Sequence, residues 1–152
     1  MTSQTTAPSL GAAYALKCRE CDAITELDAS YACVECFGPL EVAYAPAQVT
    51  RADIEAGPTS MWRYEALLPV VPGAGGRPGL QPGLTRLVRA DNLAAALGAR
   101  AVWVKDDSGN PTHSFKDRVV AVALENARRL GYDTIACAST GNTSAALAVY
   151  RA

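Results

Sequence analysis

Apolar and polar positions divide the chain into a polar start, a cysteine-bearing segment, a segment rich in proline and glycine, and a region of alternating strand and helix signals. Residues 1–15 show no hydrophobic period, so we expect a loose leader there. Short strand-like pieces separate the cysteines between Lys17 and Tyr44. Residues 69–83 (PVVPGAGGRPGLQPG) predict a linker or surface loop, because proline removes hydrogen-bond donors and glycine costs chain entropy.

Two helices and a strand are predicted directly after this loop. Asp91 can cap a short helix that Gly98 ends, and the run AVWVK at 101–105 favours a strand. Ser114 begins the next helix in a capping-box pattern with Asp117, and Gly131 ends it. Apolar residues fill one broad face of that helix: Val119, Val120, Ala123, Ala127 and Leu130.

A buried strand at 134–138 and a helix rich in Ala and Leu at 143–152 complete the pattern. Strand, crossover helix and strand make a βαβ unit, which predicts an α/β fold class with a parallel sheet covered by helices. Two parallel strands are too few to be covered on both faces, and the last helix reaches the chain end without a stop signal. We therefore expect the chain to be the first part of a larger protein, or one half of a split one.

Composition narrows the class of protein. The 152 residues carry 14 Lys and Arg against 15 Asp and Glu, a formal net charge of −1, which argues against nucleic acid as the main partner. Hydrophobic residues make up 49% of the chain, which suits a folded domain with a core. No stretch approaches the roughly 18 apolar residues of a membrane span, and the start lacks a secretion pattern. We expect a cytoplasmic protein with no membrane partner.

Four cysteines form the first chemical motif. Cys18, Cys21, Cys33 and Cys36 make two C-x-x-C pairs separated by eleven residues. Two such knuckles can supply the tetrahedral sulfur ligands of a structural zinc ion, with no position left open for water. A ribbon with weak or absent metal, or two local disulfides, remain as alternatives. The fifth cysteine, Cys137, falls in the predicted buried strand and is expected to be an inert packing residue.

Lys116 is the candidate for covalent chemistry. It falls in the first turn of the predicted helix, where the positive end of the helix dipole disfavours an ammonium, and Phe115 and Val119 can help to exclude water. Schiff-base chemistry needs a lysine with that bias. The same position also suits a solvated surface lysine.

The turn Ser139-Thr-Gly-Asn142 is the candidate anion site. It lies between the predicted strand and the last helix, where ligands bind in open parallel sheets. Gly141 permits close backbone approach, and the helix start adds N–H donors that suit a carboxylate or phosphate. A Ser/Thr helix cap with a turn glycine explains the same residues without a ligand.

Together, NPTHSFKDR at 110–118 and ASTGNTSAA at 138–146 resemble threonine synthases, pyridoxal-phosphate enzymes with the tryptophan-synthase-β type of fold. The segments LKCRECDA, CFGPLEVAY, WRYEALLP and GLTRLVRADNLAAALG are also similar to that family, so the likeness runs from about Ala15 to the chain end. The resemblance implies a lyase of threonine biosynthesis that converts O-phosphohomoserine and water to threonine and phosphate.

By this resemblance, Lys116 would hold pyridoxal phosphate covalently and act as the proton-transfer base. Asn142 would donate to the cofactor's ring hydroxyl. His113 and Arg118 could approach the substrate phosphate, although His113 also suits a solvated loop and Arg118 a pair with a nearby acid. The substrate carboxylate would be held by Ser139, Thr140, Gly141 and Thr143.

Two departures from the family pattern matter. Arg86 stands in GLTRL where relatives usually have proline, which affects the shape of that loop. The glycine-rich loop that grips the cofactor phosphate and the hydroxyl facing the pyridine nitrogen come from later sequence in the family, so we expect this chain to be inactive alone. Another pyridoxal-phosphate lyase, such as a threonine dehydratase, and a non-catalytic zinc-ribbon interaction module are the alternative functions.

The resulting domain organisation is a leader (1–15), a zinc-ribbon-like segment (16–45) and the first portion of a pyridoxal-phosphate-dependent α/β domain (46–152). The expected partners are a small-molecule substrate and either a second copy of the chain or a missing C-terminal half.

Overall fold

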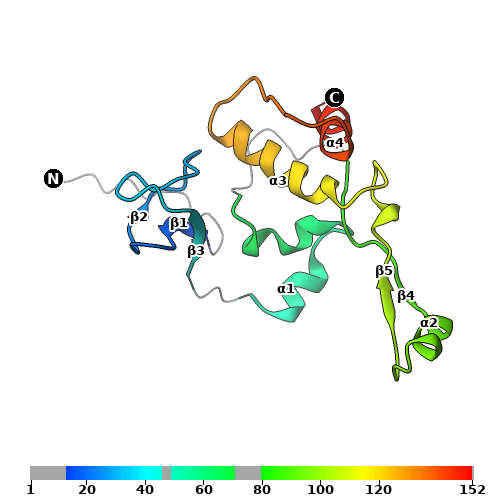
Figure 1. The fold of residues 1–152 in the computed structure, drawn as a ribbon. Coiled ribbons are helices and arrows are strands. Elements are labelled where there is room, and N and C mark those ends of the chain that lie inside the picture. Colours follow the sequence, from blue (N-terminus) through cyan, green and yellow to red (C-terminus); the bar gives the residue numbers. More distant parts are fainter. Residues whose placement is uncertain (1–12, 46–48, 71–79, 152) are drawn as a thin grey trace.

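The computed structural model describes residues 13–45, 49–70 and 80–151 (Figure 1). Most of the predicted leader and most of the predicted linker at 69–83 lie outside the described residues. The described part is a mixed α/β structure built from two small sheets and several helices. None of the described helices has the length and apolar character needed to cross a membrane.

The first sheet holds the cysteine segment. Strand β1 (Ala13–Cys18) lies between β2 (Ile24–Thr25) and β3 (Leu40–Tyr44), and both pairings are antiparallel. The prediction of a loose leader up to residue 15 is wrong for its last three residues, because Ala13 and Ala15 are buried in the central strand. Small apolar side chains let β1 pack closely, although they give no clear period in the sequence.

Two short helical segments follow the first sheet. Helix α1 (Arg51–Ala56) begins at Thr50, whose hydroxyl accepts from the Asp53 N–H while the Asp53 carboxylate accepts from the Thr50 N–H. The 3₁₀ helix η1 (Met61–Leu67) buries Trp62 at 2% exposure. This tryptophan anchors the segment before residue 70 to the core.

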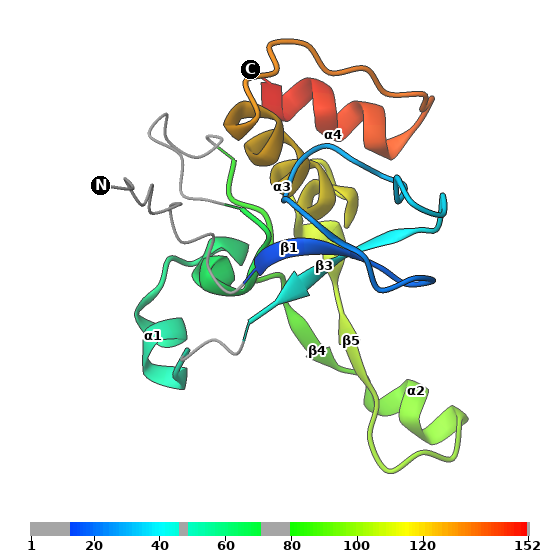
Figure 2. The same cartoon turned by 90° about the vertical axis from the view of Figure 1, so that its left-hand side faces the viewer.

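The second sheet projects from the rest of the described chain as an arm (Figure 2). Strand β4 (Leu87–Arg89) pairs antiparallel with β5 (Trp103–Lys105), and α2 (Asp91–Ala96) lies at the far end of the arm, so the connection acts as a long hairpin. The prediction of a parallel sheet is therefore wrong for the described residues. Strand β4 was not predicted, because three residues are too few to show a period.

The helix expected at Asp91 is confirmed, with Ala90 rather than Asp91 in the capping position. Gly98 ends it at a φ of +63°, as the sequence predicts.

The main core lies between α3 (Lys116–Arg129) and α4 (Asn142–Arg151), which pack against each other (Figure 1). Their apolar faces meet η1 and the end of the segment that follows it. The buried core residues are Met61, Trp62, Val70, Val120, Ala121, Leu124, Ala146 and Tyr150. The periodic pattern of the sequence thus identified both long helices, but the predicted apolar face of α3 is partly wrong, because Val119 is exposed while Ala121 and Leu124 are buried.

Gly131 ends α3 as predicted, in a Schellman motif. Its N–H donates to the carbonyl of Arg128, the N–H of Tyr132 donates to that of Ala127, and Gly131 has a φ of +79°.

The start of α3 differs from the predicted capping box. Phe115 occupies the capping position, and the Ser114 hydroxyl accepts from the Lys116 N–H at 3.2 Å. The Asp117 carboxylate accepts instead from Thr112, because the chain turns back on itself before the helix.

The predicted strand at 134–138 is wrong, since this segment forms no strand. Apolar β-formers need a neighbouring strand to complete their hydrogen bonds, and no described strand lies beside them. Cys137 is consequently exposed, not buried as expected.

Candidate functional site

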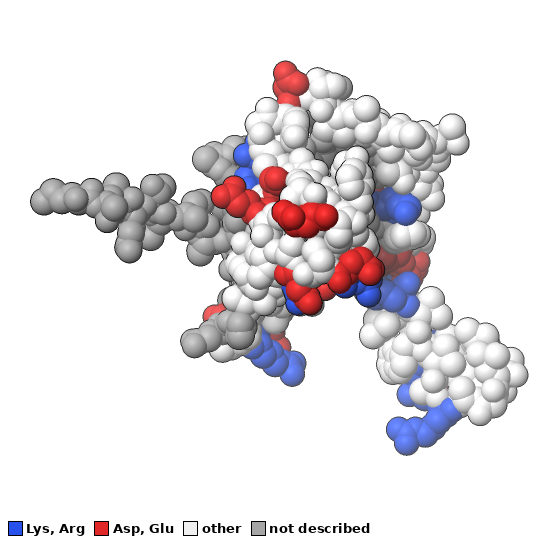
Figure 3. Space-filling view, turned by 60° about the vertical axis from the view of Figure 1, so that its left-hand side comes forward, with Lys and Arg blue, Asp and Glu red and all other residues white. Residues whose placement is uncertain are grey.

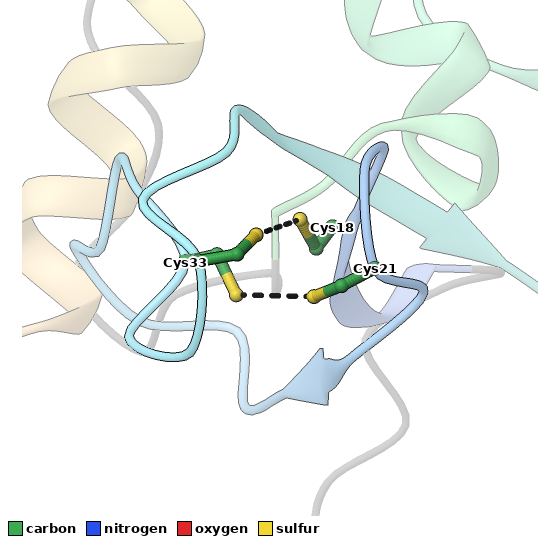
Figure 4. Close-up of side chains that lie close together, drawn as sticks. Cys18, Cys21 and Cys33 are labelled. Carbon is green, nitrogen blue, oxygen red and sulfur yellow. Dashed lines mark hydrogen bonds between the residues drawn. The ribbon is translucent and has the colours of Figure 1, made fainter.

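The four cysteines of the first sheet converge on one point (Figure 4). All four sulfur atoms lie within 4.8 Å of one another; Cys18 Sγ is 3.5 Å from Cys36 Sγ, and Cys21 Sγ is 3.6 Å from Cys33 Sγ. Four sulfurs each about 2.3 Å from a central zinc ion would have similar spacings. The donor set and its spacing therefore fit a tetrahedral metal ion.

Backbone donors support the cysteine cluster. The Glu20 N–H donates to Cys18 Sγ and the Gly38 N–H donates to Cys36 Sγ, both at 3.4 Å. Backbone N–H groups of Cys21 and Glu20 lower the pKa of the Cys18 thiol to about 7, toward the thiolate form that binds metals. A Cβ at Gly38 would lie 2.7 Å from Glu20 Cγ, so the second knuckle requires glycine.

The segment that carries the cysteines has an acidic surface, and Figure 3 shows acidic side chains gathered on one face of the molecule. Residues 13–45 carry two cations, Lys17 and Arg19, against six exposed acids: Glu20, Asp22, Glu26, Asp28, Glu35 and Glu41. A surface of that sign repels nucleic-acid phosphates.

The segment also touches the helical core. Arg129 Nη2 donates to the Leu27 carbonyl at 2.6 Å, which ties the cysteine segment to the end of α3.

Lys116 is the first residue of α3. Its backbone N–H is held by the Ser114 hydroxyl, and its Nζ lies 4.8 Å from the centre of the Phe115 ring. The side chain is half-buried, and none of the ion pairs among the described residues involves it. Its amine therefore has no carboxylate partner among the described residues.

Both residues after Lys116 are anchored. Asp117 is fully buried, and its carboxylate accepts from the Thr112 N–H at 2.8 Å and from the Thr112 hydroxyl at 2.5 Å. Arg118 binds Asp107 through two bonds, Nη2 to Oδ1 at 2.8 Å and Nε to Oδ2 at 3.1 Å. The guanidinium of Arg118 and the hydroxyl of Thr85 lower the pKa of Asp107 to about 2.

Asn110 joins this anchor to the loop before β4. It is 2% exposed, its amide donates to the Asp107 carbonyl, and its side-chain oxygen accepts from the Gly83 N–H at 3.0 Å. Gly83 has a φ of +91°, and a Cβ there would lie 2.8 Å from Arg118 Nη1.

Sequence reasoning offered a nearby acid as a partner of Arg118, and Asp107 is that acid. The contributions of Thr85 and Asn110 were missed. Two adjacent aspartates before a Ser-Gly-Asn turn were the available signal for an acid beside Arg118.

His113 and Arg86 lie on exposed loops. His113 has a φ of +58°, and its Nδ1 lies 2.9 Å from the Ser108 carbonyl oxygen. Arg86, just before β4, forms an ion pair at 3.0 Å with Asp106, just after β5.

The Ser139–Asn142 turn leads into α4, as predicted. The Gly141 N–H donates to the Ser139 hydroxyl at 3.3 Å, and the Gly141 carbonyl accepts from the Ser144 hydroxyl and the Ala145 N–H. Thr140, Gly141 and Asn142 are exposed. No hydrogen bond among the described residues joins this turn to Lys116, so the two predicted halves of the site are carried on the starts of two packed helices.

Comparison with known proteins shows which family the chain resembles. Residues 80–152, which include β4, β5, α3 and α4, match the family model of pyridoxal-phosphate dependent enzymes. The match covers both candidate motifs, Lys116 with its loop and the turn before α4.

The relatives are threonine synthases. That of Methanosarcina acetivorans is 44% identical over 145 residues, 91% of this chain and 34% of that protein. That of Methanocaldococcus jannaschii is 37% identical over 140 residues, 90% of this chain and 34% of that protein. That of Halalkalibacterium halodurans is 49% identical over 73 residues, 48% of this chain and 20% of that protein. The resemblance found in the sequence is thus confirmed, and the chain spans about a third of the length of the first two relatives.

Proposed function

We propose that this chain carries the lysine-bearing part of a threonine synthase site, which converts O-phosphohomoserine and water to threonine and phosphate. The observation that carries the proposal is the half-buried amine of Lys116, held at a helix start within the segment that matches the pyridoxal-phosphate family. The function named for its relatives gives the substrate.

The residues present suit pyridoxal phosphate. Lys116 offers an amine without a carboxylate partner among the described residues, and the start of α4 offers exposed polar groups and N–H donors. When bound, the cofactor supplies an electron sink for the substrate carbon that loses its proton.

Each candidate residue has a defined role in this proposal. Lys116 holds the cofactor by its Nζ and moves a proton at that atom, while Asn142 donates to the ring hydroxyl. The residues that bind the substrate carboxylate are Ser139, Thr140, Gly141 and Thr143. The exposure of Thr140, Gly141 and Asn142, at the positive end of α4, supports the assignment.

The Asp107 pair argues against one candidate role. Arg118 gives two donors to Asp107 and a third contact to Thr85, so binding a substrate phosphate would require breaking a paired geometry. We therefore assign Arg118 to the frame around Lys116. His113, whose ring is exposed, remains the candidate for the substrate phosphate.

The decisive experiment traps the lysine chemically. The chain is mixed with pyridoxal phosphate and with a polypeptide corresponding to the part of the Methanosarcina relative that it does not cover, then reduced with borohydride. We expect the label on Lys116 and its loss in Lys116→Ala, with Lys105→Arg as the matched control. Labelling of another lysine, or of none, contradicts the proposal.

Product analysis separates the related enzymes. Release of phosphate from O-phosphohomoserine supports a threonine synthase, whereas release of ammonia from threonine supports a dehydratase. A mixture that binds no cofactor and releases neither product supports the non-catalytic zinc-ribbon module.

We also propose that residues 16–45 form a zinc-ribbon-like unit in which Cys18, Cys21, Cys33 and Cys36 hold a structural zinc ion. The clustered sulfurs and the two backbone N–H donors support it. Metal analysis of purified chain should give about one zinc per chain, with release of zinc and loss of order in residues 13–44 after chelation. A zinc-to-chain ratio near zero, together with cysteines that do not react with a thiol reagent, would instead show disulfides.

A further inference from the structure

The chain around Lys116 is fixed more tightly than a surface loop requires. Thr112 and Asp117 bracket four residues, and two hydrogen bonds between these two residues close the bracket into a ring. Inside the ring, the Ser114 carbonyl accepts from the Asp117 N–H, and the Ser114 hydroxyl accepts from the Lys116 N–H, both at 3.2 Å. Ser114, Lys116 and Asp117 are therefore restrained by hydrogen bonds within the ring.

The ring contains one backbone conformation that is costly for its residue. His113 has a φ of +58°, a region that a residue with a Cβ enters at a cost of about 1 kcal/mol. The His113 N–H donates to the Asn110 carbonyl at 2.8 Å, which holds that conformation in place. The turn is thus imposed by its hydrogen bonds and not by local preference.

Asp117 closes the ring. Burying a carboxylate is unfavourable unless hydrogen bonds replace its water, and Asp117 is fully buried. The Thr112 N–H and hydroxyl supply two charge-assisted bonds, and the first turn of α3 supplies favourable N–H dipoles. Tyr150 of α4 brings its buried hydroxyl toward the same charge, and desolvation and the Asp117 charge both raise the pKa of that phenol.

We propose that Asp117, acting through Thr112, is a positioning residue that sets the direction of the Lys116 amine. The inference rests on the proposed role of Lys116 and adds a residue to it. Because residues 112 to 117 are closed into a ring, the Cα–Cβ bond of Lys116 has one direction, and Nζ lies over the Phe115 ring. Asp117 itself touches neither cofactor nor substrate in this proposal.

The test changes Thr112 and leaves the charged Asp117 in place. Thr112→Val removes the hydroxyl bond to Asp117 and preserves the side-chain shape, while Thr112→Ser restores the hydroxyl. The matched control is Thr50→Val, which breaks the equivalent Thr–Asp contact at the exposed start of α1. All variants are made in the full chain.

Two measurements that need no cofactor report on the ring and on the Lys116 amine. Amide hydrogen exchange at residues 113–116 should quicken by about tenfold in Thr112→Val, the size expected for one lost hydrogen bond to a charged group. Reductive methylation with formaldehyde and cyanoborohydride, read by mass spectrometry, reports Lys116 against the two other lysines, Lys17 and Lys105. The Lys116 rate should rise relative to both, because the released amine leaves its half-buried place over Phe115.

The outcomes separate positioning from simple stability. Thr112→Ser should return both readouts to wild-type values, and Thr50→Val should change neither. Faster exchange at 113–116 with an unchanged Lys116 methylation ratio would overturn the proposal, because the ring would then serve only the fold. If borohydride fails to trap the cofactor on Lys116 in any mixture, the proposed function fails, while the methylation ratio still decides the role of Asp117.

Discussion

Arg118 forms an ion pair with Asp107. The side chain therefore stabilises the loop beside Lys116 and is not free to bind a substrate phosphate. The sequence offered Arg118 either for the substrate phosphate, by resemblance, or for a pair with a nearby acid, and the structure shows the second, with two donors aligned on the Asp107 carboxylate. Such paired geometry is stronger than a single exposed ion pair. The position of an arginine in a motif therefore does not show whether it is free to bind.

This pair predicts a pH dependence of stability. The pKa of Asp107 falls from an ordinary 3.8 to about 2 in the fold, so its contribution is complete above pH 4 and is lost as the pH falls through about 2. Because the two side chains remain 26% and 30% exposed, we expect Asp107→Asn to lower the free energy of unfolding by about 1 kcal/mol at pH 7.

Urea unfolding between pH 7 and pH 2.5 measures this difference, which should shrink at the acid end. Asp91→Asn is the matched control, because Asp91 pairs with Arg89 on the exposed arm and should contribute much less. An equal loss in both variants would contradict the assignment.

At the scale of elements, the helix ends were the most predictable features. Gly98 and Gly131 both stop a helix at positive φ, and glycine is the residue that adopts this conformation without strain. The helix starts were less predictable: the Asp117 carboxylate binds Thr112 and not Ser114, because a turn outside the helix competes for it.

The strand predictions depended on partners that the pattern does not reveal. The apolar run at 134–138 has no described strand beside it, whereas the three residues of β4 pair because β5 returns next to them. Pairing is a non-local property, so composition and period identify a possible strand without showing its neighbour.

Gly131→Ala tests the helix stop. Nothing lies within 4 Å of a Cβ at this position, so the expected loss of about 1 kcal/mol would come from the positive φ alone. Gly141→Ala is the control, since a Cβ there also meets open space and the φ is not positive. Chemical unfolding of both variants should show a loss for the first and none for the second.

Cys33→Ser tests the cysteine cluster as a unit. Cys33 is 1% exposed, and its replacement should lower the bound zinc well below one per chain and quicken amide exchange across β1 and β3. Cys137→Ser, which lies outside the cluster and is exposed, should leave both measurements unchanged. Unaltered zinc content in Cys33→Ser would contradict the four-sulfur site.

At the scale of the whole described molecule, one apolar cluster joins segments far apart in the sequence. Trp62 of η1 and Val70 meet Leu124 of α3 and Tyr150 of α4. The candidate site is mounted on this cluster, since Lys116 and the Ser139–Asn142 turn stand at the starts of its two long helices. The sequence predicted those helices but not the contribution of η1.

Leu124→Ala should therefore lower the free energy of unfolding by about 3 kcal/mol, because it leaves a cavity between α3 and α4. Val119→Ala, on the exposed face of α3, should cost far less. Tryptophan emission follows the transition in a Trp103→Phe background, which leaves the buried Trp62 as the single emitter. Similar losses in the two variants would show that this cluster is not the main core.

The closed turn from Thr112 to Asp117 also restricts how this polypeptide can change in length. One residue added or removed between them would rotate Asp117 around the helix axis by about 100° relative to Thr112, beyond the reach of their two bonds. Connections without such a tie tolerate insertions at small entropic cost. In a library of single-residue insertions and deletions, variants changed between 112 and 117 should therefore fail to fold, and variants changed between Gly131 and Ser139 should fold.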